Sequence, residues 1–303
     1  MRIEIRYVVL ALILASVLYV HFRGRVRLPF FRRQLTDHSS FFAPYNVLAY
    51  LFSAVPIQPY LERKRFPQLD ALREQWHSIR NEALRLFDEG YVKGVERGED
   101  LGFSSFFKKG WKRFHLKWYG SPLPSARALC PNTVELLRRI PSVRAAMFAL
   151  LPPGAELSPH RDPFAGSLRY HLGLVTPNSD ECRIVVDGQP YSWRDGEDVV
   201  FDETYVHWAE NRTNTTRIIL FCDVDRPLRS PVLRVFNRLL GVTLGRATAA
   251  RNLHTEPLGT INRLYFVAHH TGEASKWLKR THKRIYLLLK LGINASVLYL
   301  LLR

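Results

Sequence analysis

HRDPFAGSLRYHLGL, residues 160–174, is the stretch of sequence around which the fold and the candidate site are organised. Side chains at positions i and i+2 of a β-strand point to the same face, so His160 and Asp162 can converge on one point. A second imidazole, His207, lies in the strand-like run VVFDETYVHW at residues 199–208. Two imidazoles and one carboxylate on neighbouring strands suit a non-haem Fe(II) site that keeps open coordination positions. These three residues are therefore the candidate metal ligands.

Three further polar residues accompany this triad. Arg169 and His171 alternate along the same stretch and would share one strand face. Arg217 begins the apolar run RIILFC. An arginine inside a β-barrel is costly unless an anion pairs with it, and a bound dicarboxylate would supply one through a bidentate contact. The sequence therefore indicates an anion-binding position near the candidate metal.

The residues around the triad have the pattern of an all-β unit. An apolar run at residues 143–151 is followed by strand-length pieces, with turn signals at Asp187-Gly188, Asp195-Gly196 and residues 211–215. Short strands with turns at this spacing favour a sandwich or a closed barrel. This unit is the catalytic candidate.

Composition and charge narrow the class of protein. The 303 residues are 47% apolar and 12% aromatic, which is sufficient for a folded core. Three isolated cysteines without a CxxC spacing argue against a disulfide framework and favour a reducing compartment. The formal charge is +17, and the chain from Arg226 onward holds 14 Lys and Arg but only 2 acidic residues, a net +12. Such a basic segment suits nucleic acid, anionic lipid or a phosphorylated substrate.

Apolar segments near both ends favour lipid among these partners. Residues 7–20 are uncharged and almost wholly apolar, at the short end of what spans a bilayer, and a cleaved signal peptide is the alternative. No A-x-A site follows, and residues 21–33 carry five arginines and no acid, which predicts a retained anchor with a cytoplasmic body. Residues 285–302, interrupted by Lys290 and Asn294, would span the bilayer or lie in its interface. No nucleic-acid-binding module is visible, so nucleic acid is the weaker partner.

A mixed front segment separates the anchor from the β unit. A helix is expected from Phe66, with apolar residues at three- and four-residue spacing and a stop at Gly90. A shorter helix follows, with Thr133 available for capping. Residues 103–119 mix aromatic and basic side chains, and they favour a pair of half-buried strands over a base- or sugar-binding surface. Residues 46–57 are apolar but too short to span a membrane, and they are either an interfacial helix or core.

The runs HRDPFAGSLRYHLGL and WRDGEDVVFDETYVHWAEN, followed by Arg217, resemble the aspartyl/asparaginyl β-hydroxylase family of Fe(II)/2-oxoglutarate oxygenases. The resemblance covers about residues 145–224 and implies a double-stranded β-helix, or jelly roll. It implies that Fe(II) is ligated by His160, Asp162 and His207. It also implies that Arg217 binds the far carboxylate of 2-oxoglutarate, that Arg169 and His171 lie near its iron-proximal end, and that O2 is the other co-substrate.

Together with the apolar ends, these runs are similar to the bacterial branch of the family that 2-hydroxylates a secondary acyl chain of lipid A. Two positions distinguish the chain from the peptide-hydroxylating members. Those members can have glycine at the position of Asp162, so the full triad favours the lipid branch. They also have a serine beside the co-substrate at the position of Ala149, so co-substrate binding would depend more heavily on Arg217.

We therefore expect a mainly β fold, with a double-stranded β-helix core, flanking helices and terminal membrane segments. The expected segments are a membrane anchor and basic flank at 1–33, a helical and β front at 34–142, the catalytic core at 143–225, a basic helical segment at 226–284 and a membrane-spanning or interfacial helix at 285–303. For Asp202, Glu203 and His115 we expect surface or structural roles.

The expected function is 2-hydroxylation of lipid A at the bacterial inner membrane, with the catalytic domain in the cytoplasm, lipid A or another anionic membrane lipid as partner, and no nucleic acid. One alternative is a peptidyl Asp/Asn β-hydroxylase at the membrane. The other is a non-enzymatic β-barrel binding module whose histidines are structural.

Overall fold

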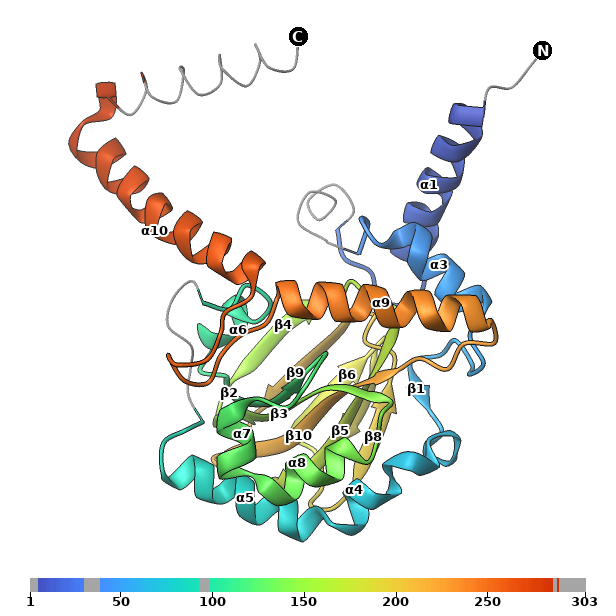
Figure 1. Cartoon of the computed structure of the whole chain (residues 1–303), viewed down its shortest axis with the longest axis vertical. Coiled ribbons are helices and arrows are strands. Elements are labelled where there is room, and N and C mark those ends of the chain that lie inside the picture. The colour runs from blue at the N-terminus through green and yellow to red at the C-terminus, as the bar shows by residue number, and fades with distance from the viewer. Residues whose placement is uncertain (1–4, 30–38, 93–98, 286–287, 289–303) are drawn as a thin grey trace.

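Two antiparallel β-sheets face each other in the computed structural model, which describes residues 5–29, 39–92, 99–285 and 288 (Figure 1). The larger sheet has the strand order β1-β8-β5-β10-β3-β2, and the smaller has the order β4-β9-β6-β7. The strands are β1 (Tyr60–Leu61), β2 (Lys112–Trp118), β3 (Val143–Leu151), β4 (Glu156–His160), β5 (Ser167–Val175), β6 (Cys182–Val186), β7 (Gln189–Ser192), β8 (Asp198–Phe201), β9 (His207–Asn211) and β10 (Arg217–Asp225).

The eight strands from β3 to β10 form a jelly roll. Strands β3, β5, β8 and β10 lie in the larger sheet and β4, β6, β7 and β9 in the smaller, so the chain passes repeatedly between the sheets. This unit runs from Val143 to Asp225. The mainly β architecture expected from the sequence is confirmed, as are its flanking helices. The division of the rest of the chain into segments stays a prediction.

Alternation along the central strands divides their side chains between two cores. In β5, Leu168, Tyr170 and Leu172 pack under the helices that cover the larger sheet. Arg169 and His171, which alternate with them, line a cavity between the two sheets. The same alternation holds in β3 and β10. A period of two therefore directs the polar residues of the central strands into the barrel.

Helices α4, α5, α7 and α8 cover the outer face of the larger sheet (Figure 1). The helices are α1 (Ile5–Phe22), α3 (Ala43–Leu51), α4 (Asp70–Glu74), α5 (Trp76–Asp88), α6 (Ser104–Phe107), α7 (Pro124–Leu129), α8 (Pro131–Arg138), α9 (Pro231–Ala247) and α10 (Thr260–Thr281), with 3-10 turns η1 (Arg63–Arg65) and η2 (Pro67–Leu69). The helix expected from Phe66 is present but is broken at Gln75, where φ is −99° and ψ is 16°. Gly90 has a φ of +73°, which glycine adopts readily, and lies just past the end of α5.

The shorter helix is α8, but Thr133 does not cap it. The N-cap residue, Cys130, makes no side-chain capping bond. Instead, the carboxylate of Glu82 in α5 accepts hydrogen bonds from the backbone N–H groups of Asn132 (3.0 Å) and Thr133 (2.9 Å). A carboxylate from a neighbouring helix thus satisfies the N-terminal amides of α8, which a local cap would otherwise do.

The prediction of two half-buried strands at residues 103–119 is wrong in its first half. This stretch contains the short helix α6 followed by the single strand β2. Gly110, with a φ of +80°, turns the chain between them. Three phenylalanines of the helical part pack against Trp111. Aromatic residues are enriched in strands, but here their packing against one another is compatible with a helical turn.

The apolar segments have different outcomes. Helix α1 is long and apolar enough to cross a bilayer by length and composition, and no other helix in the described ranges is. The second apolar segment, residues 285–303, lies outside the described residues except for 285 and 288, so it stays a prediction. In the segment 46–57, α3 buries Ala49 and Tyr50 and exposes Leu48 and Leu51, so it is part core and part surface. The three cysteines are free, as expected, and all three are buried.

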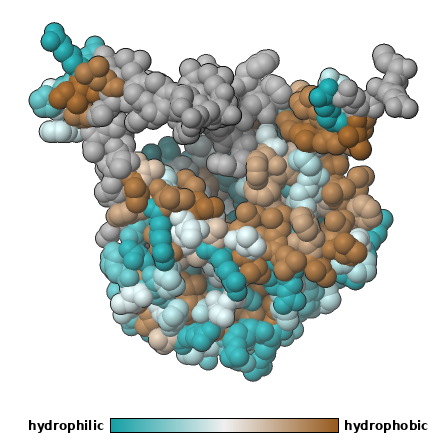
Figure 2. All heavy atoms as spheres, turned by 45° about the horizontal axis from the view of Figure 1, so that its top comes forward, coloured by the Kyte–Doolittle hydropathy of each residue, from teal (hydrophilic) through white to brown (hydrophobic). Residues whose placement is uncertain are grey.

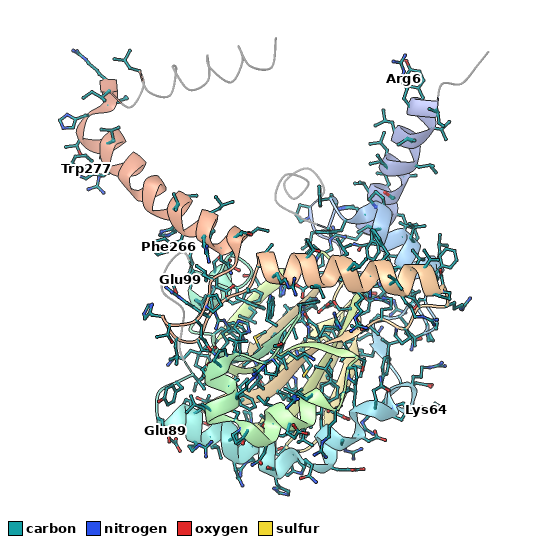
Figure 3. All side chains as sticks on the ribbon, in the orientation of Figure 1. Arg6, Lys64, Glu89, Glu99, Phe266 and Trp277 are labelled. Carbon is teal, nitrogen blue, oxygen red and sulfur yellow. The ribbon has the colours of Figure 1, made fainter. Side chains whose placement is uncertain are left out.

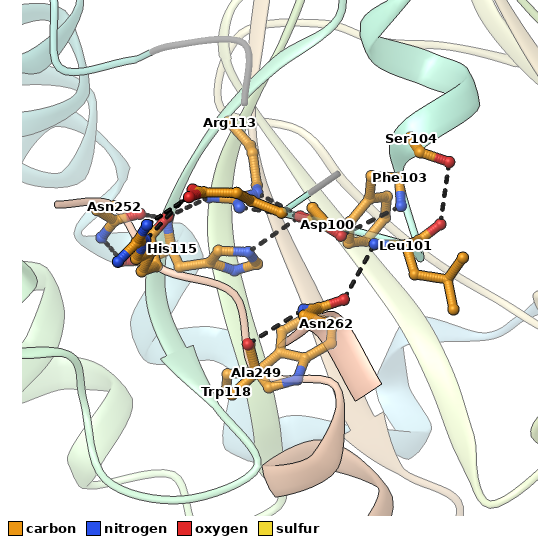
Figure 4. A network of polar contacts seen from close by, with 12 residues as sticks. Asp100, Leu101, Phe103, Ser104, Arg113, His115, Trp118, Ala249, Asn252 and Asn262 are labelled. Atoms are coloured by element: carbon orange, nitrogen blue, oxygen red, sulfur yellow. Dashed lines mark hydrogen bonds and ion pairs between the residues drawn. The ribbon is translucent and has the colours of Figure 1, made fainter. Parts of the chain in front are cut away.

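A buried polar network ties the loop between α9 and α10 to β2 (Figure 4). Arg113 pairs with Asp100 at 2.9 Å, and His115 Nε2 lies 3.9 Å from the same carboxylate. The side chain of Asn252 accepts a hydrogen bond from the backbone N–H of His115 (2.8 Å) and donates one to its carbonyl (2.7 Å). Asp100 also accepts a bond from the N–H of Phe103 (3.3 Å), which lines the cavity between the sheets. His115 is thus a buried structural residue.

Candidate active site

The three candidate ligands meet at one end of the cavity. His160 closes β4 and His207 opens β9, and the two residues are directly paired in the antiparallel register, with ring centroids 4.3 Å apart. Asp162 lies two residues past the end of β4, with Oδ1 4.0 Å from His160 Nε2. One donor atom from each of the three residues lies within 4.8 Å of the others. The turn after β4, more than the strand pleat, brings Asp162 to the histidines.

Both histidines are held in the orientation that a metal needs. Nδ1 of His160 lies 2.8 Å from the carbonyl of Ser158, and Nδ1 of His207 lies 2.9 Å from the carbonyl of Tyr205. A proton on each Nδ1 would be donated to the carbonyl, which leaves Nε2 with its lone pair for a metal. Burial, together with the neighbouring His160, lowers the pKa of His207 to about 3, so this imidazole is neutral at physiological pH. The donor set and its tautomers therefore fit a divalent transition metal.

Arg169 fixes the carboxylate of the triad. The expectation that it also lies near the iron-proximal end of 2-oxoglutarate stays a prediction. Nη2 of Arg169 donates to Asp162 Oδ2 at 2.6 Å and also contacts Glu203, and its Nε lies 3.0 Å from Asp223. The guanidinium also stacks on the ring of Phe221, 3.7 Å from the centroid. Burial alone would raise the pKa of Asp162, but Arg169 together with His207 and His160 outweighs burial and holds that pKa below its usual value.

Two of these carboxylates form a layer behind the triad. Burial raises the pKa of both Glu203 and Asp223. Ser167 donates to Glu203 at 2.7 Å, and Tyr119 donates to Asp223 at 2.9 Å. The sequence predicts a surface or structural role for Glu203 and gives no signal for Asp223 or Tyr119. Their role depends on the pairing of Asp223 with Arg169 across β10 and β5, which no local motif encodes.

Arg217 lines the same cavity without a counter-charge. Its guanidinium is 4.3 Å from the centroid of Trp193, and its Nε and Nη1 are buried without a hydrogen-bond partner. Burial lowers the pKa of Arg217 to about 10. Within the described residues, no carboxylate lies within 4.0 Å of it. A buried guanidinium with open donors is a site for one carboxylate of a ligand.

His171 and Ala149 complete this end of the cavity. Both ring nitrogens of His171 are buried without hydrogen-bond partners, and burial holds its pKa well below the usual value. Ala149 also lines the cavity and has only a methyl group at the position where the resemblance places a serine in the peptide-hydroxylating members. The arrangement combines a triad that could hold a metal, a buried guanidinium that could take an anion and a neutral imidazole that can donate or accept one hydrogen bond.

The cavity has a volume of about 620 Å³, which is within the range of small-molecule sites. Its walls between the two polar ends are mainly apolar and include Phe103, Phe106, Trp111 and Ile219. Further out, Phe41 is 82% exposed and also lines the cavity, so it marks the opening to solvent. A ligand with a polar end and a long apolar part would match this shape.

Comparison with known proteins identifies the family. A family model described as aspartyl/asparaginyl beta-hydroxylase matches residues 73–227, just over half of the chain. The ornithine lipid ester-linked acyl 2-hydroxylase of Rhizobium tropici is 42% identical over 122 residues, which cover 40% of this chain and 43% of that protein. Human aspartyl/asparaginyl beta-hydroxylase is 29% identical over 169 residues, or 54% of this chain and 22% of that protein.

Among solved structures, the prolyl-4-hydroxylase of Pseudomonas putida aligns with a TM-score of 0.33 and 18% identity, over 51% of this chain and 87% of that one. The matched part of the chain spans less than half the length of either curated relative. The protein belongs to the aspartyl/asparaginyl β-hydroxylase family.

Proposed function

We propose that this protein is an Fe(II)/2-oxoglutarate-dependent dioxygenase that adds a 2-hydroxyl group to an acyl chain of a membrane lipid, with lipid A as the substrate. One observation carries the proposal: a two-histidine, one-carboxylate triad and a buried arginine without a counter-charge share one mainly apolar cavity. A metal alone would not require Arg217, and a dicarboxylate alone would not require the triad. A reaction that uses both accounts for all four residues.

The residues of the chain have distinct parts in this reaction. His160, Asp162 and His207 would hold Fe(II), which with 2-oxoglutarate and O2 would supply the oxidising power to hydroxylate a C–H bond. Arg217 would bind the distal carboxylate of 2-oxoglutarate through its two open donors. Arg169 donates a hydrogen bond to Oδ2 of Asp162, which leaves Oδ1 of this carboxylate for the metal.

An acyl chain suits the remaining surface of the cavity better than an Asp or Asn side chain does. The lining of the cavity is mainly aromatic and aliphatic, and within the described residues its charged side chains are those of Arg161, Asp162, Arg169 and Arg217. The Rhizobium tropici relative, by its name, hydroxylates an ester-linked acyl chain at position 2. The full triad, with Asp162 present, is a further argument for the lipid branch.

The position at the membrane is part of the same proposal. Helix α1 would be a retained anchor in the bacterial inner membrane, with the catalytic domain on the cytoplasmic side. Arg25 and Arg27 follow the helix, as the positive-inside rule requires of the cytoplasmic flank. Arg280, Lys283 and Arg284 are exposed at the end of α10 and would contact lipid phosphates. Glutamine at all three positions should then lower turnover on membranes, and full activity of that variant would remove this contact from the account.

Mass spectrometry of the membrane lipids tests the reaction and the substrate together. Lipid A from cells that express the gene should carry one additional oxygen on an acyl chain, and cells without the gene or with Asp162→Ala should lack it. The same spectra should be searched for hydroxylated ornithine lipids. An added oxygen on ornithine lipids and not on lipid A would make an ornithine lipid the substrate in place of lipid A. An added oxygen on a peptide instead would select the peptidyl hydroxylase.

Iron and co-substrate turnover distinguish the enzyme from a binding module. The wild-type protein should bind Fe(II) and convert 2-oxoglutarate to succinate, and His160→Ala should do neither. If both proteins behave alike, the histidines are structural and the proposed function fails.

A further inference from the structure

Helix α9 presents an apolar stripe to the outside. Its inward residues are small or polar: Asn237, Gly241 and Gly245. Its outward residues at positions i, i+3, i+4 and i+7, here called the α9 stripe, are Val232, Val235, Phe236 and Leu239, with 76%, 61%, 50% and 62% of their surface exposed. A surface helix of a globular protein ordinarily turns such a stripe toward the core. A contiguous exposed patch of this kind marks an interaction surface.

The packing of α9 fixes this orientation. A Cβ on Gly245 would lie 2.2 Å from the Cβ of Tyr119, so only glycine allows the helix to sit this close to the barrel. Asn237 donates a hydrogen bond to the carbonyl of Gly166 (2.9 Å) and accepts one from the hydroxyl of Tyr45 (2.5 Å). The small and polar face is thus committed to the body of the protein, and the stripe must point away from it.

The first turn of α9 packs beside the C-terminal end of α1. Leu233 of α9 packs against a small cluster that contains Val20 of α1 and Ala43 of α3. Just past the end of α1, Arg23 lies over the rings of Tyr50 (4.1 Å) and Tyr205 (3.8 Å). Arg23 also pairs with the buried carboxylate of Asp202 at 2.6 Å. These contacts attach the C-terminal end of α1 to the barrel, against which α9 also packs, and so fix the position of α1 relative to α9.

These elements share one end of the molecule. Helices α1 and α10 project from the end that α9 crosses (Figure 1). Arg6 and Trp277 lie on the projecting helices, and Lys64 and Glu89 lie toward the opposite end (Figure 3). Hydrophobic residues cover a broad area of this face below the projecting helices (Figure 2).

The charge of α9 matches an anionic surface. The helix contains no acidic residue, and Arg234, Arg238 and Arg246 are exposed along it. A helix with apolar residues on its outward face and arginines beside them is typical of one that lies in a membrane interface. Arginines at that depth are attracted by anionic headgroups.

The cavity opens among the same elements. Phe41 and Phe42, which precede α3, line its outer part together with Leu244 of α9 and Ile261 of α10. Its mouth is therefore bordered by the helices that carry the exposed apolar surface.

We propose that the α9 stripe lies at the boundary between headgroups and acyl chains of an anionic bilayer and so places the cavity mouth at the membrane surface. The acyl chain then enters the site from the bilayer without exposing its methylene groups to water. The delivery of the chain rests on the proposed function, whereas the position of α9 in the bilayer does not.

Fluorescence quenching tests the position of α9 directly. The full-length protein carries an environment-sensitive fluorophore on Leu239→Cys and is reconstituted in vesicles of phosphatidylethanolamine and phosphatidylglycerol with quencher-bearing acyl chains. The matched control is Phe87→Cys on α5, a residue 39% exposed at the covered outer face of the larger sheet. The three native cysteines are buried, so labelling is selective.

We expect quenching at position 239 to exceed that at 87 by about fivefold or more, because only the former would lie among acyl chains. Equal, weak quenching at both positions would overturn the proposal. A label at position 239 could instead escape the quencher and change its emission in detergent with protein concentration. This result would also overturn the proposal, because it would show that a second copy of the chain covers the stripe.

Activity separates this inference from the proposed function. Val235→Asp combined with Leu239→Asp should lower hydroxylation of lipid in vesicles about tenfold, since the stripe could no longer enter the interface. Turnover of the same lipid dispersed in detergent should be unchanged. Equal rates for wild type and variant in vesicles would count against delivery from the bilayer. If the label is quenched but neither wild type nor variant hydroxylates lipid, the position of α9 in the bilayer is supported and the proposed function is rejected.

Discussion

Arg113 and Arg217 are both buried arginines of the larger sheet, one in β2 and one in β10, and each exposes only 2% of its surface. Arg113 is paired with Asp100 inside a network that joins distant parts of the chain. Arg217 lies over Trp193 with two open donors and, among the described residues, no carboxylate partner. The protein provides a carboxylate partner for Arg113, whose role is structural, and provides none for Arg217, where a ligand would bring the counter-charge. This difference, more than burial itself, marks the functional site.

The largest expected effect is a difference in the free energy of unfolding between two variants in which methionine replaces arginine, one at position 113 and the other at position 217. Arg113→Met should lower the free energy of unfolding by about 3–5 kcal/mol, because it leaves the charge of Asp100 buried and uncompensated. Arg217→Met should be neutral or stabilising, because it removes a buried charge that has no partner in the chain. Urea unfolding of both variants in detergent measures this. Similar losses for the two variants would mean that Arg217 has a partner within the fold.

The pH dependence of stability sharpens the description of the paired network. Burial lowers the pKa of His115 from 6.5 to about 4. As the pH falls below 6.5, the unfolded chain therefore takes up a proton that the folded protein does not, and stability falls by about 1.4 kcal/mol per pH unit until pH 4. This contribution is complete above pH 6.5. Between pH 7 and pH 5, wild type should lose about 2 kcal/mol more than His115→Gln. Parallel losses for the two proteins would show that His115 titrates normally.

A third prediction concerns the arginine that holds the triad. Arg169→Lys keeps the charge but loses the fork that contacts Asp162 and Asp223, so Fe(II) affinity should fall about 10- to 100-fold. Anaerobic calorimetric titration with Fe(II) measures it. The control is Arg63→Lys, which changes an arginine paired with Asp198 outside the site and should leave the affinity as it is. An unchanged Fe(II) affinity in Arg169→Lys would show that Arg169 does not position the carboxylate of Asp162 for the metal and contributes only to packing.

The smallest effect is expected at Ala149. Ala149→Ser adds a hydroxyl to the cavity that Arg217 and His171 also line, where one more hydrogen bond to 2-oxoglutarate is worth about 0.5–1.5 kcal/mol. The KM for 2-oxoglutarate should therefore fall about two- to tenfold. A rise in KM would indicate that the cavity has no room for the hydroxyl.

Local periodicity explains what could be predicted from the sequence. Alternation within β5 and β10 is enough to direct Arg169, His171 and Arg217 into the barrel. The spacing of His160 and Asp162 predicts that they meet, but β4 ends at the histidine, so the turn after the strand and not the strand pleat brings Asp162 there. Turn signals and short apolar runs predict an all-β sandwich or closed barrel because they recur throughout residues 143–225. The jelly roll itself is implied only by the family resemblance.

Long-range register explains what could not be predicted. Arg169 meets Asp223 only because β5 pairs with β10 in one register, and no nearby residue encodes that pairing. The same holds for Arg23 and Asp202, which lie 179 positions apart. Residues 103–107 read as a strand by composition, but packing of their aromatic side chains against Trp111 accompanies a helical turn. The outward stripe of α9 likewise becomes visible only when the buried face of the helix is known.

Equilibrium binding of 2-oxoglutarate is the most direct test of the contrast between the two arginines. The measurement is calorimetry on the full-length protein loaded with Mn(II) in place of Fe(II), for wild type, Arg217→Met and the Arg113→Met control at a temperature where all three are folded. Arg217→Met should weaken binding at least about 30-fold, since removing one partner of a buried charge pair costs about 2–5 kcal/mol. Arg113→Met should bind as wild type does. Equal affinities for wild type and Arg217→Met would contradict the claim that the unpaired arginine is the anion site.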